Sequence, residues 1–120
     1  MNRLAKWASM LALGALLASA APAAEVEGFL IDKMCSMKVV KEGQTAAAWH
    51  NTKDCALMPD CGKSGYGVYT ADGKFLTFDS AGNEKAEKAL KASKKKDNLK
   101  VKVSGDVNGD TLQVASLKLL

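Results

Sequence analysis

Residues 66–78 have the sequence YGVYTADGKFLTF, and this stretch predicts the centre of the fold. It contains two runs rich in aromatic and β-branched residues, 66–70 and 74–78, which are joined through Asp72-Gly73. An Asp-Gly pair between two such runs is typical of a β-hairpin, because glycine readily adopts the positive φ of a tight turn. We therefore expect two antiparallel strands here.

One helix and three more strands are predicted around this hairpin. The largely apolar run 26–31 suggests an opening strand, and apolar and polar residues alternate over 99–104. A further apolar run, 111–120, follows the turn residues Asn108-Gly109. Residues 82–96 instead favour a helix, with small and apolar side chains on one face and Glu–Lys pairs four residues apart.

Two local features refine these elements. Ser80 or Asn83 is a suitable residue to cap the start of the helix. Within the run 111–120 the apolar residues change from one parity to the other. A β-bulge near Ala115-Ser116 would reconcile the two halves, because the extra residue moves the following side chains to the opposite face.

The predicted order is strand, insert, strand, strand, helix, strand, strand. Five strands with a helix between the third and fourth are typical of an OB-fold. The predicted fold class is therefore mainly β (α+β): a small five-stranded OB-like barrel with the insert after its first strand. A small α+β roll with the same elements is the alternative. The insert, residues 32–64, has no clean period beyond a short helix at 46–49.

The first 24 residues have the pattern of a secretory signal peptide. Arg3 and Lys6 precede a short apolar stretch, and small residues with A-x-A cleavage patterns follow at 18–20 and 21–23. We expect cleavage, a single domain over 25–120, a periplasmic or secreted location and no membrane span afterwards. A retained membrane anchor is the alternative.

Length and charge indicate one small domain and give no support for a nucleic-acid partner. The 120 residues suit one small domain, and loss of Arg3 and Lys6 with the signal lowers the formal net charge from +4 to +2. So small a charge gives no argument for nucleic-acid binding. The run Lys94-Lys95-Lys96 is expected to form a solvated face.

A cysteine–histidine cluster in the insert is the candidate functional site. Cys35, His50, Cys55 and Cys61 follow the spacing C-x14-H-x4-C-x5-C. Three thiolates and one imidazole can complete a tetrahedral zinc site, and soft sulfur donors also suit copper. Haem is less favoured because the sequence has no C-x-x-C-H.

Neighbouring residues would support such a site. Asp54 is a candidate to orient His50, and Met37 and Met58 are candidate soft donors. With one histidine in the chain, no site that needs two can form. No nucleophile–base pair is visible, so a binding protein is favoured over an enzyme.

Two other hypotheses stay open. In an oxidising compartment two of the three cysteines would form a structural disulfide, leaving a spare thiol able to link two chains. The protein would then be a disulfide-stapled module that binds an exported partner through the barrel face or the Tyr66/Tyr69 surface. A thiol redox protein is less favoured because the sequence has no C-x-x-C.

The pattern G-x-x-x-D-x-x-C at 28–35, followed by H-x4-C-A-x4-C at 50–61 and SGYGV at 64–68, resembles a group of small exported bacterial proteins. The resemblance covers nearly all of residues 25–120. It implies a shared Cys/His constellation in an OB-like barrel, and it adds Asp32 as a partner that could orient His50. It implies no particular activity.

Overall fold

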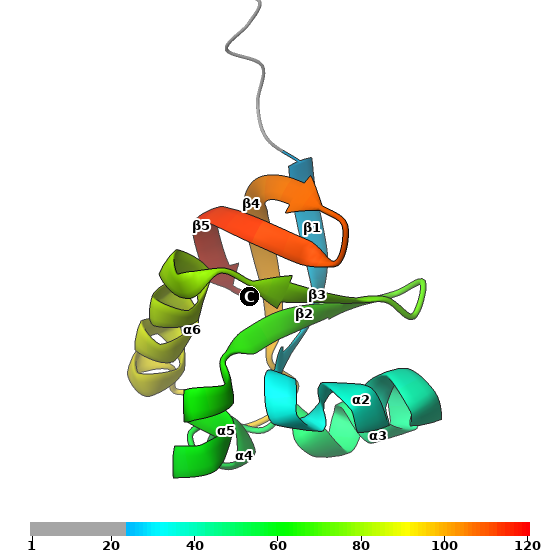
Figure 1. Ribbon diagram of the computed structural model, residues 1–120. Helices are drawn as coiled ribbons and strands as arrows, with labels where there is room; N and C mark the ends of the chain where they lie inside the picture. The colour runs from blue at the N-terminus through cyan, green and yellow to red at the C-terminus, as the bar shows by residue number, and fades with distance from the viewer. Residues whose placement is uncertain (1–23) are drawn as a thin grey trace, which may run out of the picture.

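The computed structural model describes residues 24–120 as a small α+β domain (Figure 1). The predicted signal segment lies outside the described residues, except for Ala24 at the start of the first strand. Across residues 24–120, no helix has both the length and the apolar character that crossing a membrane requires. The strands are β1 (Ala24–Asp32), β2 (Tyr66–Thr70), β3 (Phe75–Phe78), β4 (Lys100–Asn108) and β5 (Thr111–Leu119). The helices are α2 (Lys33–Glu42), α3 (Gln44–His50), α4 (Lys53–Ala56), α5 (Pro59–Ser64) and α6 (Ser80–Ala92).

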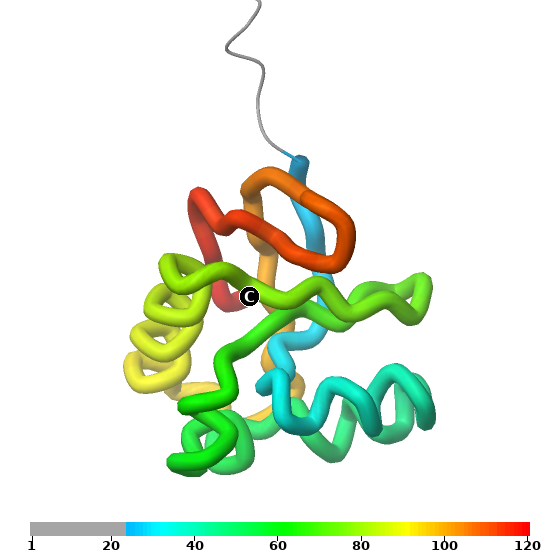
Figure 2. Tube along the Cα trace, viewed as in Figure 1, coloured from blue at the N-terminus to red at the C-terminus, as the bar shows by residue number. Residues whose placement is uncertain are grey.

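The five strands form one closed sheet in the order β1-β2-β3-β5-β4. β1 pairs antiparallel with both β2 and β4, which closes the sheet, and β3 pairs parallel with β5. Helix α6 lies against one side, and the helices of the insert gather at one end, as the chain trace in Figure 2 shows. The predicted five strands and the helix between the third and fourth are confirmed.

The predicted hairpin is confirmed. Thr70 N donates to Lys74 O over 2.8 Å, and Gly73 has a φ of 85°. The left-handed conformation explains why glycine follows Asp72 at this turn.

The predicted bulge in the last strand is also confirmed. Ser104 faces Ser116 whereas Gly105 faces Val114, so Ala115 is the extra residue in β5. The chain is tightly packed here, because a Cβ on Gly105 would lie 2.0 Å from Gln113 O.

Helix α6 starts and ends earlier than the sequence predicts. Its N-cap is Asp79, not Ser80 or Asn83, and the Asp79 carboxylate accepts from Gly82 N over 2.9 Å and from Val114 N over 3.2 Å. The prediction of the cap was wrong because the second of these bonds comes from β5, which local sequence does not reveal. The helix ends at Ala92, so the exposed lysines 94–96 lie beyond it.

The insert is helical rather than irregular, which corrects the sequence prediction. Helices α2 and α3 pack on the outside of β1 and β2 through a small second core of buried residues: Ile31, Val39, Ala46, Ala47 and Tyr69. Leu30 belongs to the main core inside the sheet, so adjacent residues at the end of β1 serve the two cores. Short helices of four to ten residues carry too few turns to show a period in the sequence.

The insert is also tied to the start of β4. The buried Asn51 Oδ1 accepts from Leu99 N over 2.7 Å, and Lys53 N donates to Lys96 O over 2.8 Å. These bonds hold α3 and α4 close to the end of β1, where the candidate site lies.

Candidate metal centre

The three cysteines occupy the same position in three different helices. Cys35 is the third residue of α2, and its N donates to the N-cap carboxylate of Asp32 over 3.0 Å. Cys55 is the third residue of α4, and its N donates to the N-cap hydroxyl of Thr52 over 3.2 Å. In both helices the capping bond therefore fixes the backbone of the cysteine itself.

Cys61 is likewise the third residue of α5, which begins at Pro59. Ser64 Oγ donates to Cys61 O over 2.6 Å and accepts from Met34 N over 3.0 Å. This hydroxyl joins the end of α5 to the first turn of α2. The starts of the two helices, and with them Cys35 and Cys61, are held together.

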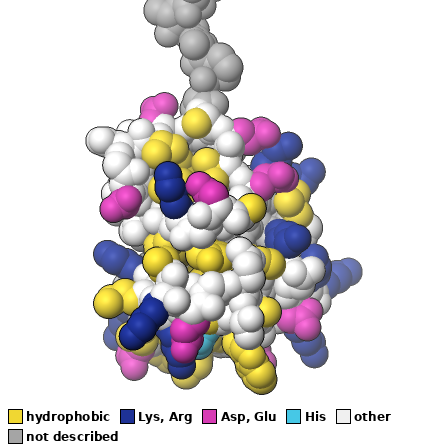
Figure 3. Space-filling model, turned by 90° about the vertical axis from the view of Figure 1, so that its right-hand side faces the viewer, with side chains coloured by type: hydrophobic (Ala, Val, Ile, Leu, Met, Phe, Trp, Pro, Cys, Tyr) yellow, Lys and Arg dark blue, Asp and Glu magenta, His cyan; other side chains and the backbone are white. Residues whose placement is uncertain are grey.

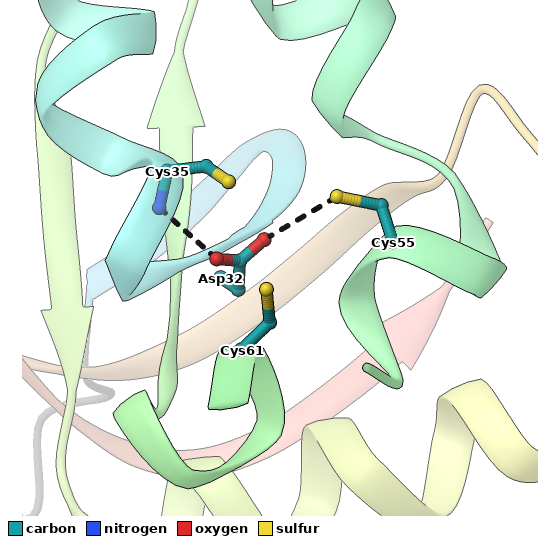
Figure 4. Close-up of side chains that lie close together, drawn as sticks. All are labelled: Asp32, Cys35, Cys55 and Cys61. Carbon is teal, nitrogen blue, oxygen red and sulfur yellow. Dashed lines mark hydrogen bonds between the residues drawn. The ribbon is translucent and has the colours of Figure 1, made fainter. Parts of the chain in front are cut away.

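The three sulfur atoms meet around the carboxylate of Asp32 (Figure 4). One carboxylate oxygen and the Sγ atoms of Cys35, Cys55 and Cys61 all lie within 4.8 Å of one another. Cys55 Sγ lies 4.0 Å from Asp32 Oδ1. All three cysteines are free thiols. Asp32 and Cys61 are buried, and the other two are half-buried.

Asp32 is a fully buried carboxylate that has no basic partner. It has 0% exposure, and the ion pairs found within residues 24–120 are Lys91–Glu87 and Lys102–Glu25. Buried charges in proteins are usually paired with an opposite charge or coordinate a metal ion. The carboxylate and its three thiols therefore form a group of donors that could hold a metal ion.

The thiols respond to the same surroundings. Burial and the adjacent Asp32 carboxylate raise the pKa of Cys35 to about 12. Burial, and then Asp32, also raise the pKa values of Cys55 and Cys61. Without a cation the thiols stay protonated at neutral pH. A bound metal reverses this preference, because its positive charge stabilises thiolates directly.

The donor set fits a tetrahedral metal ion. Zinc accepts both cysteine thiolates at about 2.3 Å and aspartate oxygens at about 2.0–2.2 Å, so two sulfur donors on one ion lie about 3.8 Å apart. The four donor atoms lie within 4.8 Å of one another, so a contraction of at most about 1 Å would bring them to these distances.

His50 lies beside the cluster and outside the group of four. It is the last residue of α3, it is half-buried, and its Nδ1 lies 4.0 Å from Cys55 Sγ. Its role as a ligand stays a prediction. Asp54 is exposed, and no hydrogen bond from it to His50 occurs among the described residues. Met37 and Met58 are 82% and 56% exposed, so neither side chain is enclosed with the thiols.

The sequence analysis predicted Asp32 as a neighbour that orients His50. In the structure its carboxylate instead lies among the three sulfur atoms. A sequence signal for this arrangement exists. A capping residue stands three positions before Cys35 and before Cys55, which predicts a helix start at each cysteine.

The Tyr66/Tyr69 surface expected for a partner does not form. Tyr66 is 1% exposed and Tyr69 is 3% exposed. The two side chains belong to different cores, one inside the sheet and one beneath α2 and α3. The prediction failed because both faces of β2 are covered, one of them by the unexpected helices.

Comparison with known proteins gives no match to a family model, a curated protein or a solved structure. The function proposed below therefore rests on the chemistry of the cluster.

Proposed function

We propose that the protein is a small exported metal-binding protein that holds one transition-metal ion in the cluster of Asp32, Cys35, Cys55 and Cys61. The observation that carries this proposal is the fully buried Asp32 carboxylate, which faces three free thiols and no basic side chain among residues 24–120. A cation at this point would balance the carboxylate and allow the thiols to ionise.

Zinc is the first candidate and copper the second. Zinc binds thiolates and carboxylates alike, whereas Cu(I) favours soft donors and gains little from an aspartate oxygen. Copper would instead draw on His50 or on the thioethers of Met37 and Met58. Those thioethers are largely exposed, so copper would have to recruit them from the surface.

We also propose an OB-type barrel and an exported location. The closed strand order β1-β2-β3-β5-β4, with α6 between β3 and β4, supports the first. The basic start, apolar stretch and A-x-A patterns of residues 1–24 support the second.

Metal titration of the reduced protein tests the proposal. Zinc added to the full chain under anaerobic conditions should bind with a stoichiometry of one, and Cys61→Ser should weaken binding strongly. Ala48→Ser serves as the matched control, because this exposed position lies outside the cluster. Failure of the reduced wild-type chain to bind zinc or copper would refute the proposal.

The second candidate is a metal-free module with a disulfide. The clustering of the three sulfur atoms motivates it. All three cysteines are free thiols in the structure, so two sulfur atoms would have to approach from within 4.8 Å to the bond length of about 2.05 Å. One thiol would remain, available to an exported partner, to a second copy of the chain or to thiol exchange. Loss of two titratable thiols in protein from the oxidising compartment would support this candidate.

A further inference from the structure

A groove beside the cluster suggests how the ion reaches its site. It has a volume of about 750 Å³ and lies between α2 and α3. Its lining residues are Lys38, Glu42, Thr45, Ala46, Trp49, His50 and Cys55. Figure 3 views the molecule from the side on which α2 and α3 lie, and apolar side chains are visible across the middle of this face and at its lower edge, with charged side chains around them.

We propose that the metal ion enters and leaves the cluster through this groove and that His50 is the ligand that receives it first. This inference rests on the proposed function. It goes further by treating the ion as exchangeable cargo and not as a permanently enclosed structural ion.

The groove reaches the cluster at one edge only. Of the four cluster residues, Cys55 alone lines it. Asp32 and Cys61 are buried and do not line the groove. An ion that arrives by this route therefore meets Cys55 before it meets the deeper donors.

His50 stands where an arriving ion would need a second ligand. It lines the groove, and its Nδ1 lies 4.0 Å from Cys55 Sγ. An ion bound to one imidazole and one thiolate holds the two donor atoms about 3.5 Å apart, given metal–ligand distances of about 2.0–2.1 Å and 2.3 Å. A small movement of the imidazole would thus allow His50 and Cys55 to hold the ion together.

Asp32 then provides the reason for the ion to move inward. Its carboxylate lies within 4.8 Å of all three sulfur atoms, whereas His50 lies outside that group. An ion that passes from His50 to Asp32 exchanges a neutral ligand for a charged one and gains the two remaining thiolates. The resident ion is thus held by the four cluster residues, and His50 is released.

An entry ligand has a kinetic signature that a resident ligand lacks. Its removal slows uptake and release by the same factor, so the equilibrium affinity does not change. The His50→Ala variant should therefore take up and release the ion about tenfold more slowly, with an unchanged dissociation constant.

The experiment follows Co²⁺ uptake by the reduced full chain in a stopped-flow instrument, through the absorption of the cobalt–thiolate bonds. Competition with a chelator gives the equilibrium affinity in parallel. The groove itself is tested with Thr45→Trp, which fills it from an exposed position on α3, and the matched control is Ala48→Trp on the same helix outside the groove. Thr45→Trp should slow uptake, and Ala48→Trp should not.

The outcomes separate the two proposals. If His50→Ala weakens equilibrium binding as much as it slows uptake, His50 is a resident ligand and the entry proposal is wrong, while metal binding stands. Unchanged rates in His50→Ala, or equal rates in the two tryptophan variants, also overturn the entry proposal. If the wild-type chain binds neither Co²⁺ nor Zn²⁺ nor copper, the proposed function fails and the entry route fails with it.

Discussion

Replacement of Asp32 by asparagine separates its two roles. The carboxylate caps α2 through its bond to Cys35 N, and it also faces the three thiols. Asparagine caps helices about as well as aspartate. Asp32→Asn should therefore keep α2 in place and remove only the negative charge from the cluster.

The expected effect appears only when metal is present. In the metal-free protein the substitution removes a buried charge that has no basic partner within residues 24–120, so the free energy of unfolding should stay the same or rise. With zinc at 100 times the wild-type dissociation constant, binding stabilises the wild type by about 2.7 kcal/mol. An affinity about 100-fold weaker, which is in the range seen when a metal site loses a supporting group, would leave about 0.4 kcal/mol.

The difference is large enough for a thermal unfolding assay. About 2.3 kcal/mol corresponds to a loss of roughly 10 °C or more in the zinc-dependent rise in Tm for a domain of this size. Asp79→Asn is the matched control, because Asp79 caps α6 in the same way and lies outside the cluster. An Asp32→Asn variant with the same zinc-dependent rise in Tm as the wild type would refute the role of the carboxylate in metal binding.

Three further predictions concern the framework around the site. Tyr66→Phe removes the 2.8 Å hydrogen bond to Ala56 O and leaves that buried acceptor unpaired. The free energy of unfolding measured with urea should therefore fall by about 1–3 kcal/mol. No change would mean that this bond contributes nothing. Burial, with Glu87 and Asp32, raises the pKa of Tyr66 to about 12, so its share of stability is complete below pH 10 and is lost as the pH rises towards 12. The wild type should therefore lose more stability than Tyr66→Phe between pH 10 and 12, and parallel pH curves would contradict this. Gly105→Ala should lower the urea midpoint by an amount equivalent to about 1–3 kcal/mol, because the new Cβ would lie 2.0 Å from the backbone oxygen of Gln113. An unchanged midpoint would show that the backbone around the bulge shifts to accept the Cβ at no cost.

The framework of five strands and α6 was predictable from the sequence because its signals are local. The turn at Asp72-Gly73 and the change of parity around Ala115 each depend on a few neighbouring residues, and both features occur where the sequence predicts them. The convergence of Cys35, Cys55 and Cys61 was also predictable, since the three lie within one short insert.

The insert was harder to predict because its structure depends on contacts with the rest of the fold. Helix α4 has four residues and α5 has six, too few to show a helical period. The burial of Asp32 arises where α2, α4 and α5 meet at the end of β1. Only its position three residues before Cys35 signals a cap, and nothing local signals the sulfur atoms around it.

The most direct test of metal binding in the cluster is a count of free thiols combined with elemental analysis on protein recovered from the periplasm, the exported location proposed above. If the cluster binds one metal ion, three thiols react after denaturation and one equivalent of metal is found, with zinc expected. One reactive thiol and no metal would contradict metal binding and would establish the disulfide-stapled form instead.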